Sequence, residues 1–226
     1  MTTETSIRQL SSERLAELVT RHVINPKSDI VSVLDIGCGD GVVADFLPPN
    51  ARYQGIDIND ACIYEKKVSD KRIDYVNNEN LVSVIQKANR ADCILLLDVL
   101  EHTADFVGLL QAAAAKKPQY IVVSLPNELF IYDRLRFLFG VEHPAHSLTL
   151  VGLPNGFKHQ YLINISKARS LLTTTLHEYN YLLSEEVYRE LKPKKMLMRI
   201  PMKCLRLISN PDLWSMGSIF VFKYKP

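Results

Sequence analysis

The chain has 226 residues, 47% of them hydrophobic, and a formal net charge of +2. This length suits one domain with additions, the apolar fraction allows a full core, and the small charge gives no indication of nucleic-acid binding by itself. Membrane spans and secretion are not expected: no apolar run reaches about eighteen residues, the N-terminus has no apolar signal-peptide core, and the four cysteines are scattered, so we predict a reduced, cytoplasmic protein.

Helical and strand-like segments alternate along the chain. A first helix is predicted over 6–23, within an N-terminal helical cap of residues 1–28. Strands are predicted at 31–36, 52–57, 73–76, 92–97, 119–124, 176–183 and 218–224. Further helices are predicted at 41–46, 60–68, 79–89, 103–116 and 128–139. This alternation indicates a parallel sheet with helices on both faces, and the last two strands, with no crossover helix between them, fit an antiparallel edge pair.

The first strand runs into a glycine turn, VLDIGCGDG (33–41), with glycines at positions 37, 39 and 41. Glycine lets the backbone turn tightly and lets a ligand approach it closely, and this turn belongs to the sheet edge where ligands bind. A dinucleotide fingerprint would need a third glycine where Val42 stands, and Asp35 would repel a pyrophosphate. The pattern therefore favours a ligand with positive charge over a tight turn that binds nothing.

A second acid, Asp57 in YQGIDIN, ends the next strand. An acid about 20 residues beyond a glycine turn can accept both hydroxyls of a ribose. The alternative is a helix N-cap, for which Asn59 and Asp60 are better placed. The sequence therefore favours the ribose role for Asp57.

Together with LLLDVLEH and IVVSLPN, these two motifs resemble the class I S-adenosylmethionine-dependent methyltransferases over about residues 30–125. The resemblance implies an α/β Rossmann-like sheet of seven strands in the order 3-2-1-4-5-7-6, with strand 7 antiparallel and helices on both faces, as a single domain over 1–226. It also implies S-adenosylmethionine as the cofactor.

The same resemblance implies roles for individual residues. Asp35, Gly37, Cys38 and Gly39 would hold the methionine end of the cofactor, and Asp57 would hold the ribose. The remaining residues implied at the cofactor site are Ile58 on the adenine, Glu79 at the adenine amino group, and Leu97 and Asp98 at the end of the fourth strand.

DVLEH (98–102) brings two acids and an imidazole to the sheet edge. Its residues could simply cap the following helix. Alternatively His102 is a general base near the methyl acceptor, or Asp98, Glu101 and His102 bind a divalent cation with His159 as a fourth ligand. The cation alternative rests on a resemblance to polyprenyl-quinol and small-RNA 2′-O-methyltransferases, which usually have Glu where this chain has Asp98. We predict His102, Asp98 and His159 as the catalytic residues and assign no metal ligands.

Two later segments are predicted to serve the acceptor. A helix and lid over 128–165 carry acceptor-side candidates at His143, His146, His159 and Tyr161. A basic insertion over 184–212 precedes the last strand, and its part 191–210 has six basic residues and no acid. That stretch either packs on the domain or contacts anionic lipid or a lipid-linked acceptor at a membrane surface.

We therefore predict a methyltransferase that acts on an oxygen or nitrogen atom of a small-molecule, glycan or lipid-linked acceptor. The first alternative is a metal-dependent RNA 2′-O-methyltransferase, with nucleic acid as the partner. The second is a non-catalytic adaptor with a methyltransferase fold. The adaptor hypothesis predicts damaged cofactor residues, and the intact Asp35, Gly37, Gly39 and Asp57 argue against it.

Overall fold

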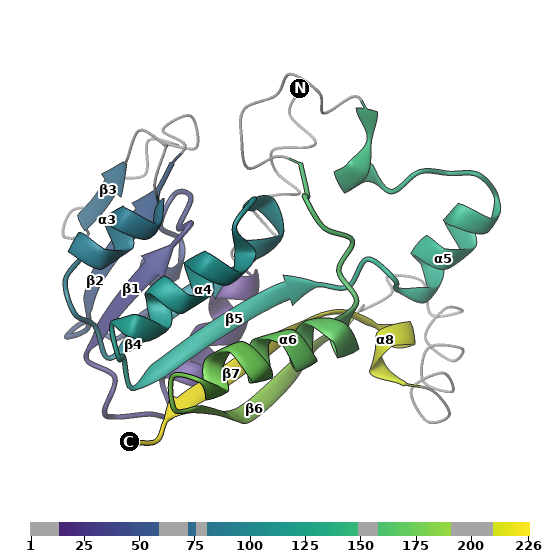
Figure 1. Cartoon of the computed structure of the whole chain (residues 1–226). Helices are drawn as coiled ribbons and strands as arrows, with labels where there is room; N and C mark the ends of the chain where they lie inside the picture. Colours follow the sequence, from purple (N-terminus) through teal and green to yellow (C-terminus); the bar gives the residue numbers. More distant parts are fainter. Residues whose placement is uncertain (1–13, 59–71, 76–80, 149–157, 191–209) are drawn as a thin grey trace. The chain divides into compact units, whose positions relative to one another are not determined.

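The structure is a computed structural model that describes residues 14–58, 72–75, 81–148, 158–190 and 210–226 (Figure 1). Several predicted features lie outside these ranges. They are the helix at 60–68, Glu79, residues 1–13 of the N-terminal cap, the lid residues 149–157 and the basic residues 191–209.

Seven strands form one hydrogen-bonded sheet in the order β3-β2-β1-β4-β5-β7-β6, which confirms the predicted order. They are β1 (Ser32–Ile36), β2 (Arg52–Asp57), β3 (Arg72–Tyr75), β4 (Cys93–Leu97), β5 (Tyr120–Pro126), β6 (Tyr181–Glu190) and β7 (Ser215–Tyr224). β1 pairs in parallel with β2 and with β4, and β2 pairs in parallel with β3. β6 and β7 are antiparallel, as the missing crossover helix predicted.

The central strands are buried along nearly their whole length. Every residue of β1 is buried, as are the first four residues of β4 and the first six of β5. Continuous apolar runs such as CILLL are typical of parallel strands covered on both faces. These runs made the central strands predictable to within two residues at either end.

The helices are mostly shorter than predicted. Residues 14–19 are helical and continue into a π-helical turn, η1 (Thr20–Ile24). The helices that follow are α2 (Val43–Phe46), α3 (Leu81–Lys87), α4 (Phe106–Ala115), α5 (Ile131–Leu138) and α8 (Pro211–Trp214). Two 3₁₀ turns, η3 (Leu100–His102) and η4 (Pro144–His146), lie in the segments that carry the candidate catalytic residues.

The sequence reading missed one long helix, α6 (Ile165–His177). The strand predicted at 176–183 was therefore wrong at its start, because residues 176 and 177 end α6 and β6 begins at Tyr181. β6 also runs to Glu190, so the first residues of the predicted insertion 184–212 belong to a strand. A helical signal was present: Asn164 caps the helix by accepting a hydrogen bond from Lys167 N–H at 2.9 Å, and Ile165, Ala168 and Leu172 share a buried stripe.

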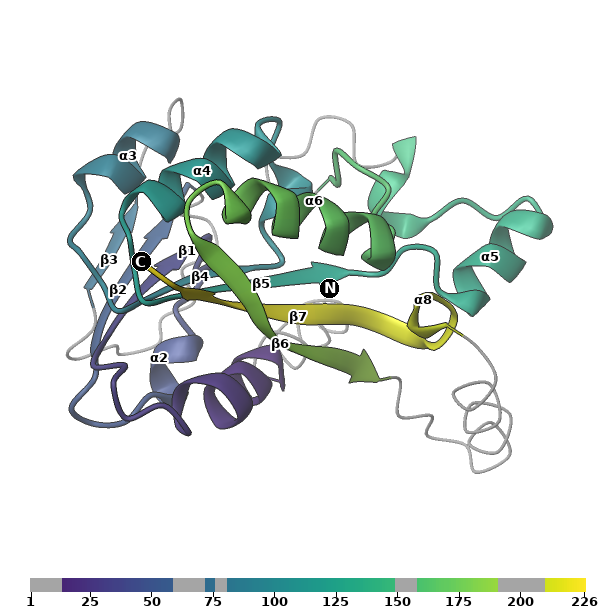
Figure 2. The same ribbon diagram turned by 60° about the horizontal axis from the view of Figure 1, so that its bottom comes forward.

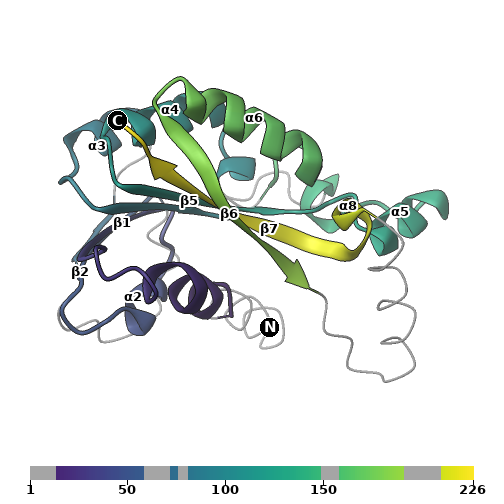
Figure 3. The same cartoon turned by 90° about the horizontal axis from the view of Figure 1, so that it is seen from below.

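The chain divides into two compact units, residues 1–97 with 112–122 and residues 98–111 with 123–226. In the first unit, the helical residues 14–24 and α2 lie on one face of β1 and β2, and α3 lies on the other (Figures 2 and 3). In the second unit, α6 packs on β6 and β7 (Figure 2). Within the described residues, no helix combines the length and the apolar composition that a membrane span requires.

Candidate functional site

The glycine turn after β1 has the backbone that its sequence predicts. Gly37, Gly39 and Gly41 have φ of 73°, 56° and 73°, in the left-handed region that side chains with a Cβ rarely adopt. The amides of Gly37 and Cys38 both donate to the carbonyl of Ile56, at 2.7 and 3.2 Å. A Cβ built on Gly39 would meet no atom of the described residues within 4 Å, so among them open space adjoins the backbone there.

Asp57 lies against this turn. Because β1 and β2 are parallel neighbours, their carboxyl ends meet at one edge, and Gly39 N–H donates to Asp57 Oδ2 at 2.7 Å. Asp57 is 8% exposed, and Ile58, next along the chain, is partly buried. The structure therefore brings the two predicted cofactor motifs together.

Asp35 lies beneath the same turn and is only 2% exposed. Burial raises the pKa of its carboxyl to about 7; a hydrogen bond from Tyr53 Oη, at 2.8 Å, opposes this shift, and the charge of Asp57 adds to it. A ligand ammonium would compensate the charge of an ionised Asp35. This buried acid and the open space at Gly39 fit the methionine end of S-adenosylmethionine.

Gly55, which sequence reasoning missed, supports the turn from β2. A Cβ on Gly55 would lie 2.6 Å from Cys38 Sγ and 3.1 Å from Tyr53 Oη. Burial raises the pKa of the Cys38 thiol, so Cys38 is a neutral packing group. The glycine in YQGID gave no signal of this role, because the Cys38 contact comes from the pairing of the two strands.

Asp98, predicted at both the cofactor and the catalytic site, has a left-handed backbone with φ of 51°. Its carboxylate accepts from Ser124 Oγ at 2.7 Å and from Arg189 Nη1 at 2.6 and 2.7 Å. Arg189 was missed because it lies on β6, in the segment read as an insertion. Arg189 therefore contacts both carboxylate oxygens of Asp98, and its positive charge balances the negative charge of that carboxylate.

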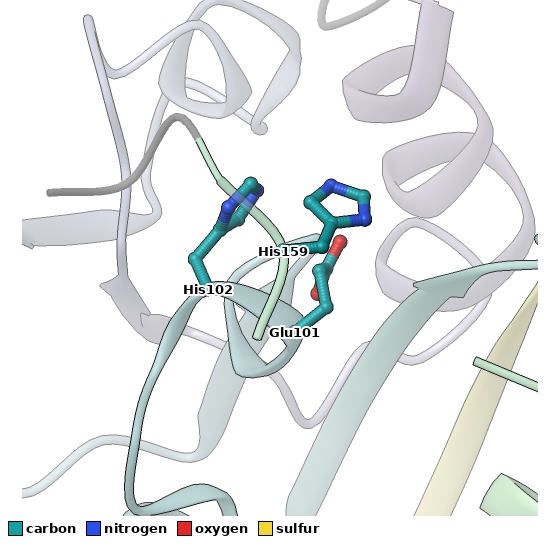
Figure 4. A group of neighbouring side chains, drawn as sticks. All are labelled: Glu101, His102 and His159. Carbon is teal, nitrogen blue, oxygen red and sulfur yellow. The ribbon is translucent and has the colours of Figure 1, made fainter. Parts of the chain in front are cut away.

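Glu101 and His102 project from η3 toward His159, which comes from a segment more than fifty residues later (Figure 4). Glu101 is 1% exposed, and its Oε2 has no hydrogen-bond partner among the described residues. Burial, with a further contribution from Asp98, raises the pKa of Glu101. One ligand atom from each of these three residues lies within 4.8 Å of the others, so the group could hold a cation.

His102 is held as a neutral imidazole. Burial, followed by the neighbouring His159, lowers its pKa to about 4. The two rings meet edge to face with centroids 4.5 Å apart. His102 Nδ1 lies 3.3 Å from the carbonyl oxygen of Lys158, and since a carbonyl only accepts, Nδ1 carries the proton and Nε2 has the lone pair.

His159 belongs to a segment, residues 158–161, that is hydrogen-bonded to the DVLEH turn and to Ala104. Gln160 N–H donates to the Glu101 carbonyl at 2.7 Å, and Tyr161 Oη donates to the Ala104 carbonyl at 2.6 Å. His159 Nδ1 contacts Glu128 Oε1 at 2.5 Å. Glu128 directly follows the SLPN turn, and the sequence analysis did not assign it a role.

Three comparisons with known proteins bear on this geometry. A family model described as a methyltransferase domain matches residues 6–175. Among curated protein sequences, none matches this chain.

Solved structures share the fold at low identity. The chain is similar to a SAM-dependent methyltransferase from Archaeoglobus fulgidus, with 15% identity and a TM-score of 0.62 over 93% of this chain and 94% of that one. It is also similar to magnesium protoporphyrin IX methyltransferase from Synechocystis with bound SAH, with 13% identity and a TM-score of 0.59 over 100% of this chain and 88% of that one. A third similar structure is the small RNA methyltransferase HEN1, with 16% identity and a TM-score of 0.58 over 96% of this chain and 25% of that one.

Proposed function

The chain belongs to a family of S-adenosylmethionine-dependent methyltransferases, and on that premise we propose that it methylates an oxygen or nitrogen atom of a small-molecule, glycan or lipid-linked acceptor. The observation that carries the proposal is the convergence of Asp35, the glycine turn and Asp57 in one unit of the chain. Bound S-adenosylmethionine supplies a methyl group already activated on a sulfonium, so the protein mainly positions the acceptor and excludes water.

On this proposal, each cofactor residue has one task. Asp35 faces the methionine ammonium, whose charge favours the ionised carboxyl. Asp57 accepts the ribose hydroxyls, the amides of the glycine turn approach the methionine end, and Ile58 packs on the adenine. Leu97 closes the end of β4, and Glu79 remains a prediction outside the described residues.

The acceptor side is assigned to the second unit. His102 Nε2 takes the proton of the acceptor hydroxyl or amine, because Nδ1 is committed to Lys158 and the ring is neutral. Asp98 positions neighbouring groups, since Arg189 Nη1 engages both of its carboxylate oxygens. Exposed apolar side chains of α5 and the residues after it, such as Leu138, Phe139 and Leu148 at 75–79% exposure, favour a lipid-linked acceptor within this class.

Calorimetric titration with S-adenosylmethionine tests the cofactor residues. Asp57→Ala should weaken binding by about tenfold or more, roughly 1.4 kcal/mol. Asp29→Ala is a matched control, because Asp29 precedes β1 while the glycine turn follows it. Equal affinity of the Asp57 variant and the wild type would remove the ribose assignment, and no binding by folded wild-type protein would restore the adaptor hypothesis.

The proposed acceptor class and the proposed base are tested by transfer of labelled methyl groups. The acceptors would be a panel of hydroxyl- and amine-bearing compounds, including polyprenyl-linked saccharides. With a panel member that is methylated, His102→Ala should lower kcat by about 10²-fold, while exposed His22→Ala should not change it. A His102 variant with unchanged kcat would rule out the base.

The second candidate is a cation-dependent RNA 2′-O-methyltransferase. It is favoured by the unpartnered Oε2 of Glu101 beside His102 and His159, since a buried carboxylate is stabilised by a cation. The similarity to the HEN1 structure, which is titled a small RNA methyltransferase, shows the fold alone. Methylation of short RNA that requires Mg²⁺ or Mn²⁺ and is lost with Glu101→Gln would favour this candidate over the first.

A further inference from the structure

A second group of histidines surrounds Glu128, and it shares His159 with the Glu101 group. The segment H-P-A-H places His143 and His146 at either end of η4 (Pro144–His146). In a 3₁₀ turn, side chains three residues apart eclipse one another. Pro144 presets the backbone of the first position, so both rings are directed to the same side by local sequence.

Glu128 is held rigidly in front of these rings. Glu128 is 1% exposed. The backbone N–H of Glu128 donates to the Ile163 carbonyl at 3.1 Å, and Glu128 Oε2 accepts from Ile163 N–H at 2.7 Å. Its other oxygen, Oε1, lies 3.0 Å from His146 Nε2 and 3.8 Å from His143 Nδ1. His159 Nδ1 approaches the same oxygen to 2.5 Å.

Hydrogen bonding explains two of these contacts but not the third. His146 and His159 can each donate a ring N–H to Glu128 Oε1. His143 Nδ1 instead accepts a hydrogen bond from Ala145 N–H at 3.3 Å, so it carries a lone pair. Its distance of 3.8 Å to Glu128 Oε1 is too long for a hydrogen bond, and an ion bound at Nδ1 would take the lone pair that now accepts from Ala145 N–H.

The distances suit a shared ion. Two ligand atoms that each bind zinc at about 2.0–2.2 Å lie roughly 3–4 Å apart in tetrahedral geometry. One ligand atom from each of Glu128, His143 and His146 lies within 4.8 Å of the others. We propose that Glu128, His143 and His146 bind a divalent transition-metal ion such as Zn²⁺, while His159 Nδ1 hydrogen-bonds to Glu128 Oε1 and holds the carboxylate in place.

The surroundings agree with this assignment. The far nitrogen of the His143 ring, Nε2, lies 4.0 Å from Asp133 Oδ1, so a carboxylate lies near the ring without a direct hydrogen bond. Metal binding requires a neutral imidazole and an ionised carboxylate. It would therefore replace the hydrogen bond between His146 Nε2 and Glu128 Oε1.

With three protein ligands, the fourth position of a tetrahedral site is left to water. Such an ion would connect η4 to the turn that follows β5. The proposal is independent of the methyl-transfer chemistry, and metal content can be measured without it.

The test uses the full chain, stripped with a chelator and titrated with Zn²⁺ and with Co²⁺, whose visible absorption reports tetrahedral coordination. Wild-type protein should bind about one ion per chain. The double variant His143→Ala, His146→Ala should bind at least about 100-fold more weakly, while exposed His22→Ala and the neighbouring His102→Ala should bind as the wild type does.

A second variant keeps the test decisive if the double variant does not fold. His143→Cys should retain Co²⁺ and add the intense thiolate-to-cobalt charge-transfer absorption that identifies position 143 as a ligand. No ion in folded wild-type protein, unchanged affinity in a folded double variant, no charge-transfer absorption with His143→Cys, or loss of the ion with His102→Ala would each overturn the proposal. The last outcome would place the ion at Glu101, His102 and His159.

Discussion

At the scale of single residues, the role proposed for Asp35 predicts that cofactor binding depends on pH. Its pKa is raised to about 7 mainly by burial, so without a ligand the carboxyl is protonated below that pH. The folded state then holds the proton more tightly than the unfolded chain, and this contribution to stability falls as pH rises from about 4 to 7. A cationic ligand favours the ionised form of the Asp35 carboxyl over the protonated form, because opposite charges attract.

We therefore expect the affinity for S-adenosylmethionine to rise between about pH 6 and 7.5, by at most tenfold per unit. Calorimetry across this range measures it, and Asp35→Asn should bind weakly with little pH dependence. An affinity that is flat in the wild type would mean that Asp35 does not face the ammonium.

Gly55 controls the same site sterically. Gly55→Ala would place a Cβ 2.6 Å from Cys38 Sγ, so the glycine turn must shift. We expect a loss of about 1–3 kcal/mol in unfolding free energy and weaker cofactor binding. Urea denaturation and calorimetry measure the two effects. Adding Cys38→Ala should recover most of both, and a double variant no better than Gly55→Ala alone would show that the clash is not with Cys38.

At the scale of secondary-structure elements, β6 contributes an ion pair to the proposed acceptor side. Arg189 reaches Asp98, the residue after β4, through Nη1. Because both side chains are largely buried, at 18% and 29% exposure, we expect a coupling free energy of about 1–2 kcal/mol between Arg189→Ala and Asp98→Ala in a double-mutant cycle. Urea denaturation of the four proteins measures it. The pair Arg169 and Glu186, which joins α6 to β6, is a matched reference. If that pair shows coupling and the Asp98–Arg189 pair shows none, the Asp98 ion pair does not contribute to stability.

The elements differ in how far sequence could predict them. β1, β4 and β5 are continuous apolar runs, so their places could be read from the sequence. The order of the strands followed from the family resemblance. α6 was missed because the run LHEYNYLL at its end alternates like a strand, although only its last residues, from Tyr181, pair with β7. Local periodicity could not decide where the helix ends and the strand begins.

At the scale of the whole molecule, the limit of prediction is set by contacts between distant segments. The glycine turn and Asp57 were predictable because parallel strands bring their carboxyl ends to one edge. The ion pair of Asp98 with Arg189 and the histidines around Glu128 join segments 91 and up to 31 residues apart. No local pattern encodes such pairings, so the individual histidines could be noted as candidates but not assigned to a group.

The division of the chain into two units allows one further prediction, which the fluorescence of Trp214 would test. The proposed cofactor residues Asp35 and Asp57 belong to the first unit, while Trp214, the single tryptophan, belongs to the second. It is 7% exposed and packs on Phe130 and Tyr188, so its fluorescence should change on unfolding. β5 has residues in both units, and all seven strands share one sheet.

Because the sheet is continuous, we expect both units to unfold in one cooperative transition. S-adenosylhomocysteine at 100 times its Kd should then stabilise the protein by about 2.7 kcal/mol, and Trp214 fluorescence should report the same gain as far-ultraviolet circular dichroism during urea denaturation. Asp57→Ala should remove the gain in both signals. A ligand that shifts only the circular dichroism would show that the second unit unfolds independently, and that coupling between the cofactor and acceptor residues is not carried by global stability.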